Sequence, residues 1–209
     1  MHEEYAAGTA LLVVDVQNDF ADRAGGLFVG GAEAILPLLN EEIAAARAAG
    51  AVIAYTQDWH PASTPHFAKD GGTWPVHCVG GTWGAQIHPG LIADAGPSIR
   101  KGSNGEDGYS GFTMRDHRTG ATVPTELDGL LRSHGVRRVV IGGLATDYCV
   151  RATVLDALAL GYETHVLVDG VRPVEIAAGD GERALAEMER AGAVLVHRSA
   201  AAAVVEGRA

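Results

Sequence analysis

The sequence predicts a single α/β domain spanning residues 1–209: a doubly wound, three-layer αβα arrangement around a mainly parallel six-stranded sheet. Two observations support this prediction. Short apolar runs alternate along the chain with segments in which apolar residues recur at helical spacing. The 209 residues also contain no internal repeat and no linker, and this length suits one globular domain with a sizeable core.

The expected strands are the short apolar runs. The first covers residues 10–14 and stops at Asp15; it is too short for a helix and is typical of a buried strand. The runs expected to form the sheet are residues 10–14, 51–56, 97–100, 136–141, 163–168 and 193–197.

Two helices are expected before the fourth strand. Apolar residues recur at helical spacing over residues 35–46, and Gly50 stands where a helix C-cap belongs. Thr125 and Asp128 have the spacing of a capping box that would open the second helix, which Gly135 would close.

The remaining segments follow the same alternation. Helices are expected at residues 147–160 and 182–191, and the Ala-rich tail after Ser199 is expected to be a short helix or a frayed end. Residues 57–96 form a long irregular stretch rich in Gly, Pro, Trp and His. Irregular stretches of this length are usually disordered or functional, and the aromatic residues favour a functional one.

Composition and charge exclude several classes of protein. Apolar residues make up 47% of the chain and charged residues 20%, which is normal for a folded α/β protein and wrong for a disordered one. The formal net charge of -10, without a basic cluster, disfavours binding to nucleic acid or to an anionic membrane surface. The acidic N-terminus lacks a signal-type apolar run, and no apolar stretch could span a bilayer, so we expect a cytoplasmic protein.

Reactive side chains follow four of the expected strands. Asp15 follows the first, Asp58 and His60 follow the second, Lys101 ends the third, and Cys149 follows the fourth after a Gly-rich turn. Ligands of such sheets bind outside the carboxyl ends of the strands. The topology is therefore expected to bring an acid, a metal-type pair, a base and a thiol to one edge.

Cys149 is the candidate nucleophile. It lies in a small-residue turn, residues 142–149, that leads from a strand into a helix. The positive end of the helix dipole would lower the pKa of the thiol, and free backbone N–H groups there could hold an oxyanion. An inert buried cysteine is about as probable on these grounds. Only one other cysteine, Cys78, is present, and free thiols are expected rather than a disulfide.

Asp15 and Lys101 are candidates to act beside that thiol. An acid placed directly after an apolar run is costly to bury unless it is paired, although such a residue can also simply cap a loop. Lys101 alone would be read as a solvated surface charge. Together, the aspartate could accept the thiol proton while the lysine stabilises anionic states.

A second group has the character of a metal site. Asp58, His60, His66 and His77 occur within twenty positions, and in an extended segment the two members of Asp58-x-His60 point to the same side. Imidazoles with one carboxylate suit one divalent ion, zinc first, with iron(II) or manganese also suitable. Unrelated loop histidines are the simpler alternative. Other residues fit a metal less well: Cys78 and His88 lie nearby, and His117, His134, His165 and His197 are read as structural or surface residues.

Aromatic residues lie in or beside these loops. They could cover the core, or they could form stacking walls for a flat small-molecule substrate. The residues in question are Phe20, Trp59, Trp74, Trp83 and Tyr109.

Taken in order, these segments resemble the isochorismatase-like cysteine hydrolases and, within them, the nicotinamidase/pyrazinamidase group. The resemblance extends from Leu11 to about His197. The metal segment favours this group, because related carbamoyl and ureido hydrolases generally lack it. The segments that carry the resemblance are residues 11–20, 58–60, 74–78, 100–102, 109–112 and 143–149.

The resemblance implies roles for individual residues. It implies a triad of Asp15, Lys101 and Cys149, a cis peptide between Leu144 and Ala145, and an oxyanion held by the amides of Ala145 and Cys149. It implies a metal bound by Asp58, His60 and His77, with His66 as a further ligand in some members. The implied substrate pocket uses Phe20, Trp74 and Tyr109. Leu144 and Tyr148 are further candidates for substrate binding, and the role of Tyr148 is left open.

The reaction implied by the resemblance is hydrolysis of nicotinamide to nicotinate and ammonia through a cysteine thioester, with pyrazinamide as a second substrate. Two alternatives stay open: a related enzyme acting on another small amide or lactam, and a non-catalytic small-molecule binder. The native metal, any assembly into homo-oligomers, and the role of the loop from Ser103 to Gly108 are also left open.

Overall fold

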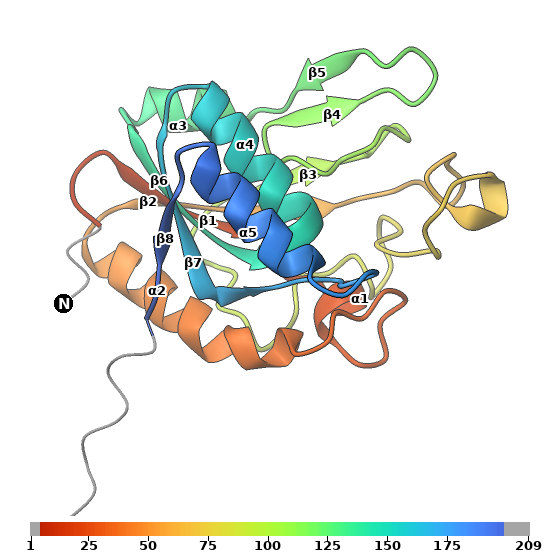
Figure 1. The fold of residues 1–209 in the computed structure, drawn as a ribbon, viewed down its shortest axis with the longest axis horizontal. Coiled ribbons are helices and arrows are strands. Elements are labelled where there is room, and N and C mark those ends of the chain that lie inside the picture. The colour runs from red at the N-terminus through yellow and green to blue at the C-terminus, as the bar shows by residue number, and fades with distance from the viewer. Residues whose placement is uncertain (1–4, 199–209) are drawn as a thin grey trace, which may run out of the picture.

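The computed structural model describes residues 5–198, and six of its strands form one sheet in the order β3-β2-β1-β6-β7-β8. Every neighbouring pair in this sheet is parallel, which confirms the expected architecture (Figure 1). The strands are β1 (Thr9–Val14), β2 (Val52–Asp58), β3 (Ser98–Lys101), β6 (Arg138–Leu144), β7 (Glu163–Arg172) and β8 (Val194–Val196).

Helices cover both faces of the sheet, as expected for a three-layer fold (Figure 1). One core contains Leu11 and Val13 of β1 and the apolar side of α2. The other contains Leu12 and Val14 and the apolar residues of α3, α4 and α5. Because β1 is buried on both faces, its sequence is a continuous apolar run without alternation. The helices are α1 (Asn18–Ala21), α2 (Leu36–Ala48), α3 (Leu127–Ser133), α4 (Arg151–Ala159) and α5 (Asp180–Arg190), with short 3-10 turns η1 (Ala32–Ile35) and η2 (Ala68–Asp70).

The expected capping box of α3 is wrong. The Thr125 hydroxyl donates to the Gly111 carbonyl at 2.6 Å and accepts from the Leu127 amide at 3.2 Å. Asp128 does not reach back to Thr125; it pairs with Arg132 and accepts a hydrogen bond from Tyr162. The Asp128 carboxylate therefore pairs with Arg132, four positions along the same helix, and with the distant Tyr162 instead of capping the helix.

The first turn of the helix expected at residues 147–160 also differs. It is a separate π-helical turn, η3 (Thr146–Val150), followed by α4. Single π-type turns of this kind are frequent at functional sites.

A two-stranded antiparallel hairpin, β4 (Thr113–Arg115) and β5 (Thr122–Pro124), was not expected from the sequence. Its strands are only three residues long and largely exposed, so they leave no apolar pattern. The expectation for the tail after Ser199 lies outside the described residues.

The loops that follow the parallel strands gather at one end of the sheet. The irregular stretch between β2 and β3 and the β4–β5 hairpin both lie at the end where β1, β2 and β3 finish (Figure 1). This is the edge at which a site was expected. Among residues 5–198, no helix is both long and apolar enough to cross a membrane.

Candidate active site

Lys101, the last residue of β3, lies at the centre of the reactive cluster. Its ammonium is 2.6 Å from Asp15 Oδ2 and 2.6 Å from Asp58 Oδ1, and it donates to the carbonyl of Gly108. It also lies 3.6 Å from the sulfur of Cys149. The side chain is fully buried. The structure thus brings the four expected strand ends into one contact network.

Asp15 is held in place by its backbone and by a neighbouring strand. It follows β1 directly and has a φ of 49°, a left-handed conformation that aspartate tolerates better than most residues. The Thr56 hydroxyl donates to Asp15 Oδ1 at 2.6 Å, which leaves Oδ2 for Lys101. Asp15 and Cys149 offer atoms within 4.8 Å of each other, close enough for a proton to pass after a small movement.

The pKa values of the two carboxylates that share Lys101 are shifted in opposite directions. Burial raises the pKa of Asp15, and the Lys101 ammonium only partly offsets this effect. Burial acts on Asp58 in the same direction, but the Lys101 ammonium and the nearby imidazoles hold the pKa of that carboxyl well below its usual range. Asp15 is therefore the better proton acceptor, and Asp58 stays an anion suited to a cation.

Cys149 lies within the π-helical turn η3 and is 6% exposed. Burial raises the pKa of its thiol well above the usual range, against the lowering effect of Lys101. The sequence-based expectation that the helix dipole lowers this pKa is therefore wrong. The loss of hydration and the two nearby carboxylates outweigh the partial charge of a helix end.

Three imidazoles and Asp58 form a second cluster beside the first. His60, His66 and His77 offer ligand atoms within 4.8 Å of one another. Asp58 Oδ2 lies 3.6 Å from His60 Nε2 and 3.7 Å from His77 Nε2. His77 Nδ1 lies 2.8 Å from the Pro75 carbonyl; as a donor there, it leaves Nε2 as the free nitrogen.

These residues fit a divalent cation. His60 is 1% exposed, yet neither of its ring nitrogens has a hydrogen-bond partner in the described part of the chain. Two buried carboxylates also share a single ammonium, which leaves negative charge to be balanced. Burial lowers the pKa of His66 and so favours the neutral imidazole that binds metal. An ion held by Asp58 and the imidazoles would satisfy all three.

A small pocket opens onto both clusters. Trp74 donates to the Tyr109 hydroxyl at 2.9 Å, and Tyr148 packs edge-on against Trp74 with ring centroids 4.8 Å apart. Burial raises the pKa of Tyr109 to about 12, so its hydroxyl stays protonated at neutral pH. The lining residues are Phe20, Leu27, Asp58, His66, Trp74, His77, Tyr109, Ala145, Tyr148, Cys149 and Val174.

Leu144 is the expected pocket residue that the structure places elsewhere. It is fully buried in the core and does not line the pocket, although the Leu144–Ala145 peptide is cis, as the resemblance implied. Ala145 and Cys149, whose amides were expected to hold an oxyanion, both line it. Trp59 stacks under the Arg100 guanidinium, and Trp83 is 47% exposed, so neither forms a wall.

Sequence reasoning missed several residues that support the site. Gln17 is fully buried; its amide donates to the Asp58 carbonyl at 2.7 Å, and its oxygen accepts from the Asp58 N–H at 2.8 Å. Thr56 bonds Asp15, and the Gly108 carbonyl accepts from Lys101. The available signal for Gln17 was a polar residue directly beyond an apolar strand, close to Asp15.

Asp107 and His117 were also missed. Asp107 Oδ1 lies 2.8 Å from His66 Nδ1 and 3.0 Å from His117 Nε2. His117, read from the sequence as structural or surface, thus connects to the metal-type cluster through one carboxylate. Nothing in the local sequence indicated this contact, because it joins two loops about forty positions apart.

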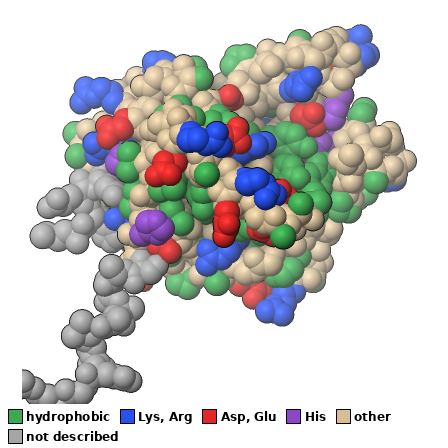
Figure 2. Space-filling view, in the orientation of Figure 1, with side chains coloured by type: hydrophobic (Ala, Val, Ile, Leu, Met, Phe, Trp, Pro, Cys, Tyr) green, Lys and Arg blue, Asp and Glu red, His purple; other side chains and the backbone are tan. Residues whose placement is uncertain are grey.

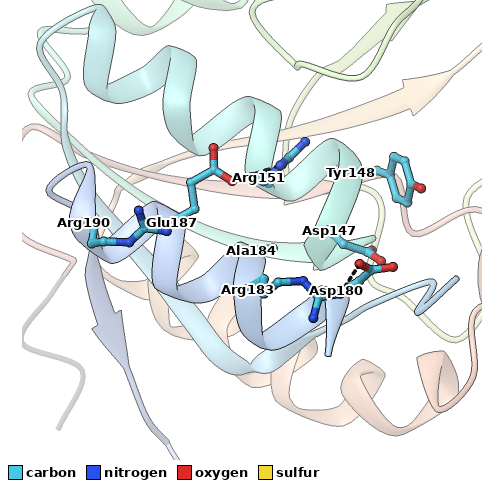
Figure 3. A pocket seen from close by; sticks show the side chains of 8 residues that line it. All are labelled: Asp147, Tyr148, Arg151, Asp180, Arg183, Ala184, Glu187 and Arg190. Atoms are coloured by element: carbon cyan, nitrogen blue, oxygen red, sulfur yellow. Dashed lines mark hydrogen bonds and ion pairs between the residues drawn. The ribbon is translucent and has the colours of Figure 1, made fainter. Parts of the chain in front are cut away.

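A separate hollow of about 400 Å³ lies between α4 and α5 (Figure 3). Its charged side chains already neutralise one another: Arg151 pairs with Glu187 at 3.0 Å and Arg183 with Asp180 at 2.6 Å. Figure 2 likewise shows acidic and basic side chains interspersed over this face. The residues that line the hollow include no thiol and no imidazole, whereas the smaller pocket is lined by Cys149, His66 and His77, so we assign the chemistry to the smaller pocket.

Comparison with known proteins gives consistent matches along the chain. A family model described as the isochorismatase domain matches residues 9–199. The nicotinamidase of Escherichia coli strain K12 is 40% identical over 203 residues, covering 89% of this chain and 93% of its own. The residues matched by the family model span both clusters described above.

Solved structures give the same result. Pyrazinamidase of Pyrococcus horikoshii in complex with zinc has a TM-score of 0.80 and 40% identity, covering 91% of this chain and 99% of its own. PnC1 from L. infantum in complex with nicotinate has a TM-score of 0.83 and 37% identity, covering 91% and 93%.

Proposed function

This chain belongs to the isochorismatase family, and from that premise we propose that it is a nicotinamidase, an amidohydrolase that converts nicotinamide to nicotinate and ammonia. The single observation that carries the proposal is the contact of Lys101 with Asp15 and Cys149 beside a metal-type cluster. A nicotinamidase relative at 40% identity, matched along most of both chains, supports the substrate.

A divalent metal belongs to this function, and zinc is the ion we propose. Asp58, His60 and His77 would hold it, with His66 as a further ligand. Three imidazoles with one carboxylate suit zinc, and a relative of similar fold was solved with zinc. When bound, the ion supplies a Lewis acid that orients and polarises the heteroaromatic ring of the substrate.

The proposed reaction begins with a protonated thiol. Asp15, whose pKa is raised by burial, takes the proton from Cys149 as the sulfur attacks the carboxamide carbon. The amides of Ala145 and Cys149 stabilise the oxyanion, and losing one such donor typically costs about 3 kcal/mol. The positive charge of Lys101 offsets the negative charge of the buried carboxylate and of the developing thiolate.

Breakdown of the intermediate uses the same proton. Asp15 returns it to the amide nitrogen, the C–N bond breaks, and ammonia leaves a thioester on Cys149. Asp15 then accepts a proton from a water molecule that attacks the thioester carbon. The C–S bond breaks, and Asp15 returns the water proton to the sulfur. The product is the carboxylic acid, which loses its proton to ammonia in solution and becomes nicotinate, so that atoms and protons balance over the cycle.

The aromatic pocket accounts for the choice of a flat substrate. Phe20, Trp74, Tyr109 and Tyr148 present ring faces and edges around Cys149, which suits stacking of a pyridine ring. Pyrazinamide has nearly the same shape and retains a ring nitrogen at the corresponding position. We therefore propose it as a second substrate.

Ammonia release from nicotinamide, measured on purified protein, tests the proposal directly. The assay is run as purified, after chelation, and after adding back zinc, iron(II) or manganese, and a panel of ureido, carbamoyl and lactam substrates runs alongside. Activity that is lost on chelation and restored by metal is expected. Cys149→Ala should lower turnover at least about 10³-fold, and substantial residual activity in that variant would rule out the thioester route.

A further inference from the structure

We propose that Asp107 is the positioning residue for the metal ligand His66, and that His117 holds Asp107 in that role. The inference rests on the metal site of the proposed function and extends it to two residues outside the ligand set proposed above, Asp58, His60, His66 and His77. Its basis is an array of three side chains: His66 Nδ1 lies 2.8 Å from Asp107 Oδ1, which lies 3.0 Å from His117 Nε2.

The array determines which nitrogen of His66 faces the metal. A carboxylate accepts hydrogen bonds only, so the ring nitrogen 2.8 Å from Asp107 carries the proton. The lone pair is then on Nε2, the nitrogen left for the cluster with His60 and His77. A carboxylate that accepts from the far nitrogen of a metal-bound imidazole fixes its tautomer and raises its basicity.

The three histidines differ in this respect. His77 Nδ1 faces a backbone carbonyl, that of Pro75, at 2.8 Å, and His60 has no hydrogen-bond partner for either ring nitrogen in the described part of the chain. His60 and His77 lie beside Asp58, which is itself a proposed ligand, whereas the carboxylate beside His66 belongs to Asp107, which is outside the proposed ligand set. The orientation of the His66 ring therefore depends on Asp107, and Asp107 can be substituted while all the proposed metal ligands are kept.

Asp107 is itself held by the β4–β5 hairpin, and its loop is tied to the loop that carries His66. Its backbone exchanges two hydrogen bonds with Arg115 of β4, at 2.8 and 2.9 Å. His117, in the turn of the same hairpin, places its Nε2 3.0 Å from the Asp107 carboxylate. The loop that carries Asp107 is also tied to the loop that carries His66, because the Thr64 hydroxyl donates to the Gly105 carbonyl at 3.2 Å. The β4–β5 hairpin is thus part of the support for the metal site.

Burial decreases along the array toward solvent. The His66 side chain is 4% exposed, that of Asp107 is 21% and that of His117 is 25%. The outer residues can therefore be substituted without opening the core. In an array that orients a metal ligand, we expect the ligand at the buried end and the supporting residues at the exposed end, and this is the observed order.

The test is zinc affinity, measured by competition with a chromophoric chelator on the full chain, together with the visible spectrum of the cobalt(II)-substituted protein. Asp107→Ala should weaken zinc binding by about 10–100-fold and change the cobalt spectrum. Asp107→Asn keeps a neutral acceptor and should fall between Asp107→Ala and the parent protein. His117→Phe should weaken binding in the same direction and less than Asp107→Ala.

Glu106→Ala is the matched control. Glu106 is the neighbouring carboxylate in the same loop, and its side chain bonds only to Asn104 among the described contacts. It should leave both zinc affinity and the cobalt spectrum unchanged. Circular dichroism of each apo variant shows that the fold is intact.

Two results would overturn the inference. One is a parent protein that binds one zinc tightly while Asp107→Ala and Asp107→Asn bind it equally well with unaltered cobalt spectra. The other is a second equivalent of zinc, lost in His117→Phe, which would make His66, Asp107 and His117 a metal site of their own. Failure of the proposed function is distinct, since in that case the parent protein itself would bind no metal or release no ammonia.

Discussion

The Lys101 ammonium lies 2.6 Å from the Asp15 carboxylate, and neither side chain is exposed to solvent. A buried charge pair is retained only where both partners are satisfied, because each ion loses its hydration on folding. Here the ammonium is shared with Asp58 and the Gly108 carbonyl. The pair therefore contributes both to the stability of the fold and to the proposed reaction, and stability and activity can be measured separately.

Replacing Lys101 with Met should destabilise the protein strongly. It would leave two buried carboxylates facing each other without a cation, and breaking a buried pair typically costs about 3–5 kcal/mol. Urea denaturation of the metal-free protein measures the free energy of unfolding. Lys69→Met is the control, because it removes an exposed pair with Asp70 at 2.6 Å and should cost at most about 1 kcal/mol. Equal losses in the two variants would contradict the assigned burial cost.

The thiol of Cys149 should react with a neutral alkylating agent only slowly at neutral pH. Burial raises its pKa, so the unreactive thiol predominates there, and the alkylation rate should keep rising above the usual cysteine value of about 8.5. Mass spectrometry of zinc-loaded protein over a pH series gives the rate. Cys149→Ala provides the blank, since Cys78 is fully buried and its pKa is also raised by burial. A rate that levels off below pH 7 would show a stabilised thiolate instead.

Removing the metal should lower thermal stability. A ligand that binds only the folded state stabilises it by about 4 kcal/mol at 1,000 times its Kd, so chelation should lower the Tm and zinc should restore it. Differential scanning calorimetry measures both. Cys149→Ala should show the same shift, because its sulfur is not among the proposed ligands, whereas His60→Ala should lose it. An unchanged Tm on chelation of metal-loaded protein would argue against the site.

Asp147 should hold the pocket residue Val174 in position and take no direct part in the reaction. Its carboxylate accepts from the Val174 amide at 2.9 Å and the Glu175 amide at 3.0 Å, and Val174 lines the pocket. Asp147→Ala should lower stability by about 2–3 kcal/mol and raise the KM for nicotinamide more than it lowers kcat. Among the contacts within residues 5–198, Asp156→Ala loses only a bond from Thr113, which lies outside the pocket, and it should leave KM unchanged. A selective loss of kcat in Asp147→Ala would point to a direct part in the reaction.

The sheet could be predicted from the sequence because its strands are buried on both faces. Residues 10–14 form an unbroken apolar run that fits few other structures, and the strand ends then indicated where Asp15, Lys101 and Cys149 would meet. The hairpin β4–β5 could not be predicted, since its short strands are held by backbone pairing and leave no apolar pattern. The cap of α3 was misread because Asp128 finds a stronger partner in Arg132.

The sequence by itself determined the alternation of strands and helices, the edge at which the reactive residues meet, and the family to which the chain belongs. These properties follow from local patterns of apolar and reactive residues. Only the tertiary structure decided that Asp107 and His117 stand behind His66, and that Cys149 is held as a thiol. Both depend on burial and on contacts between segments distant in the chain, and free energies of desolvation have no signature in local sequence.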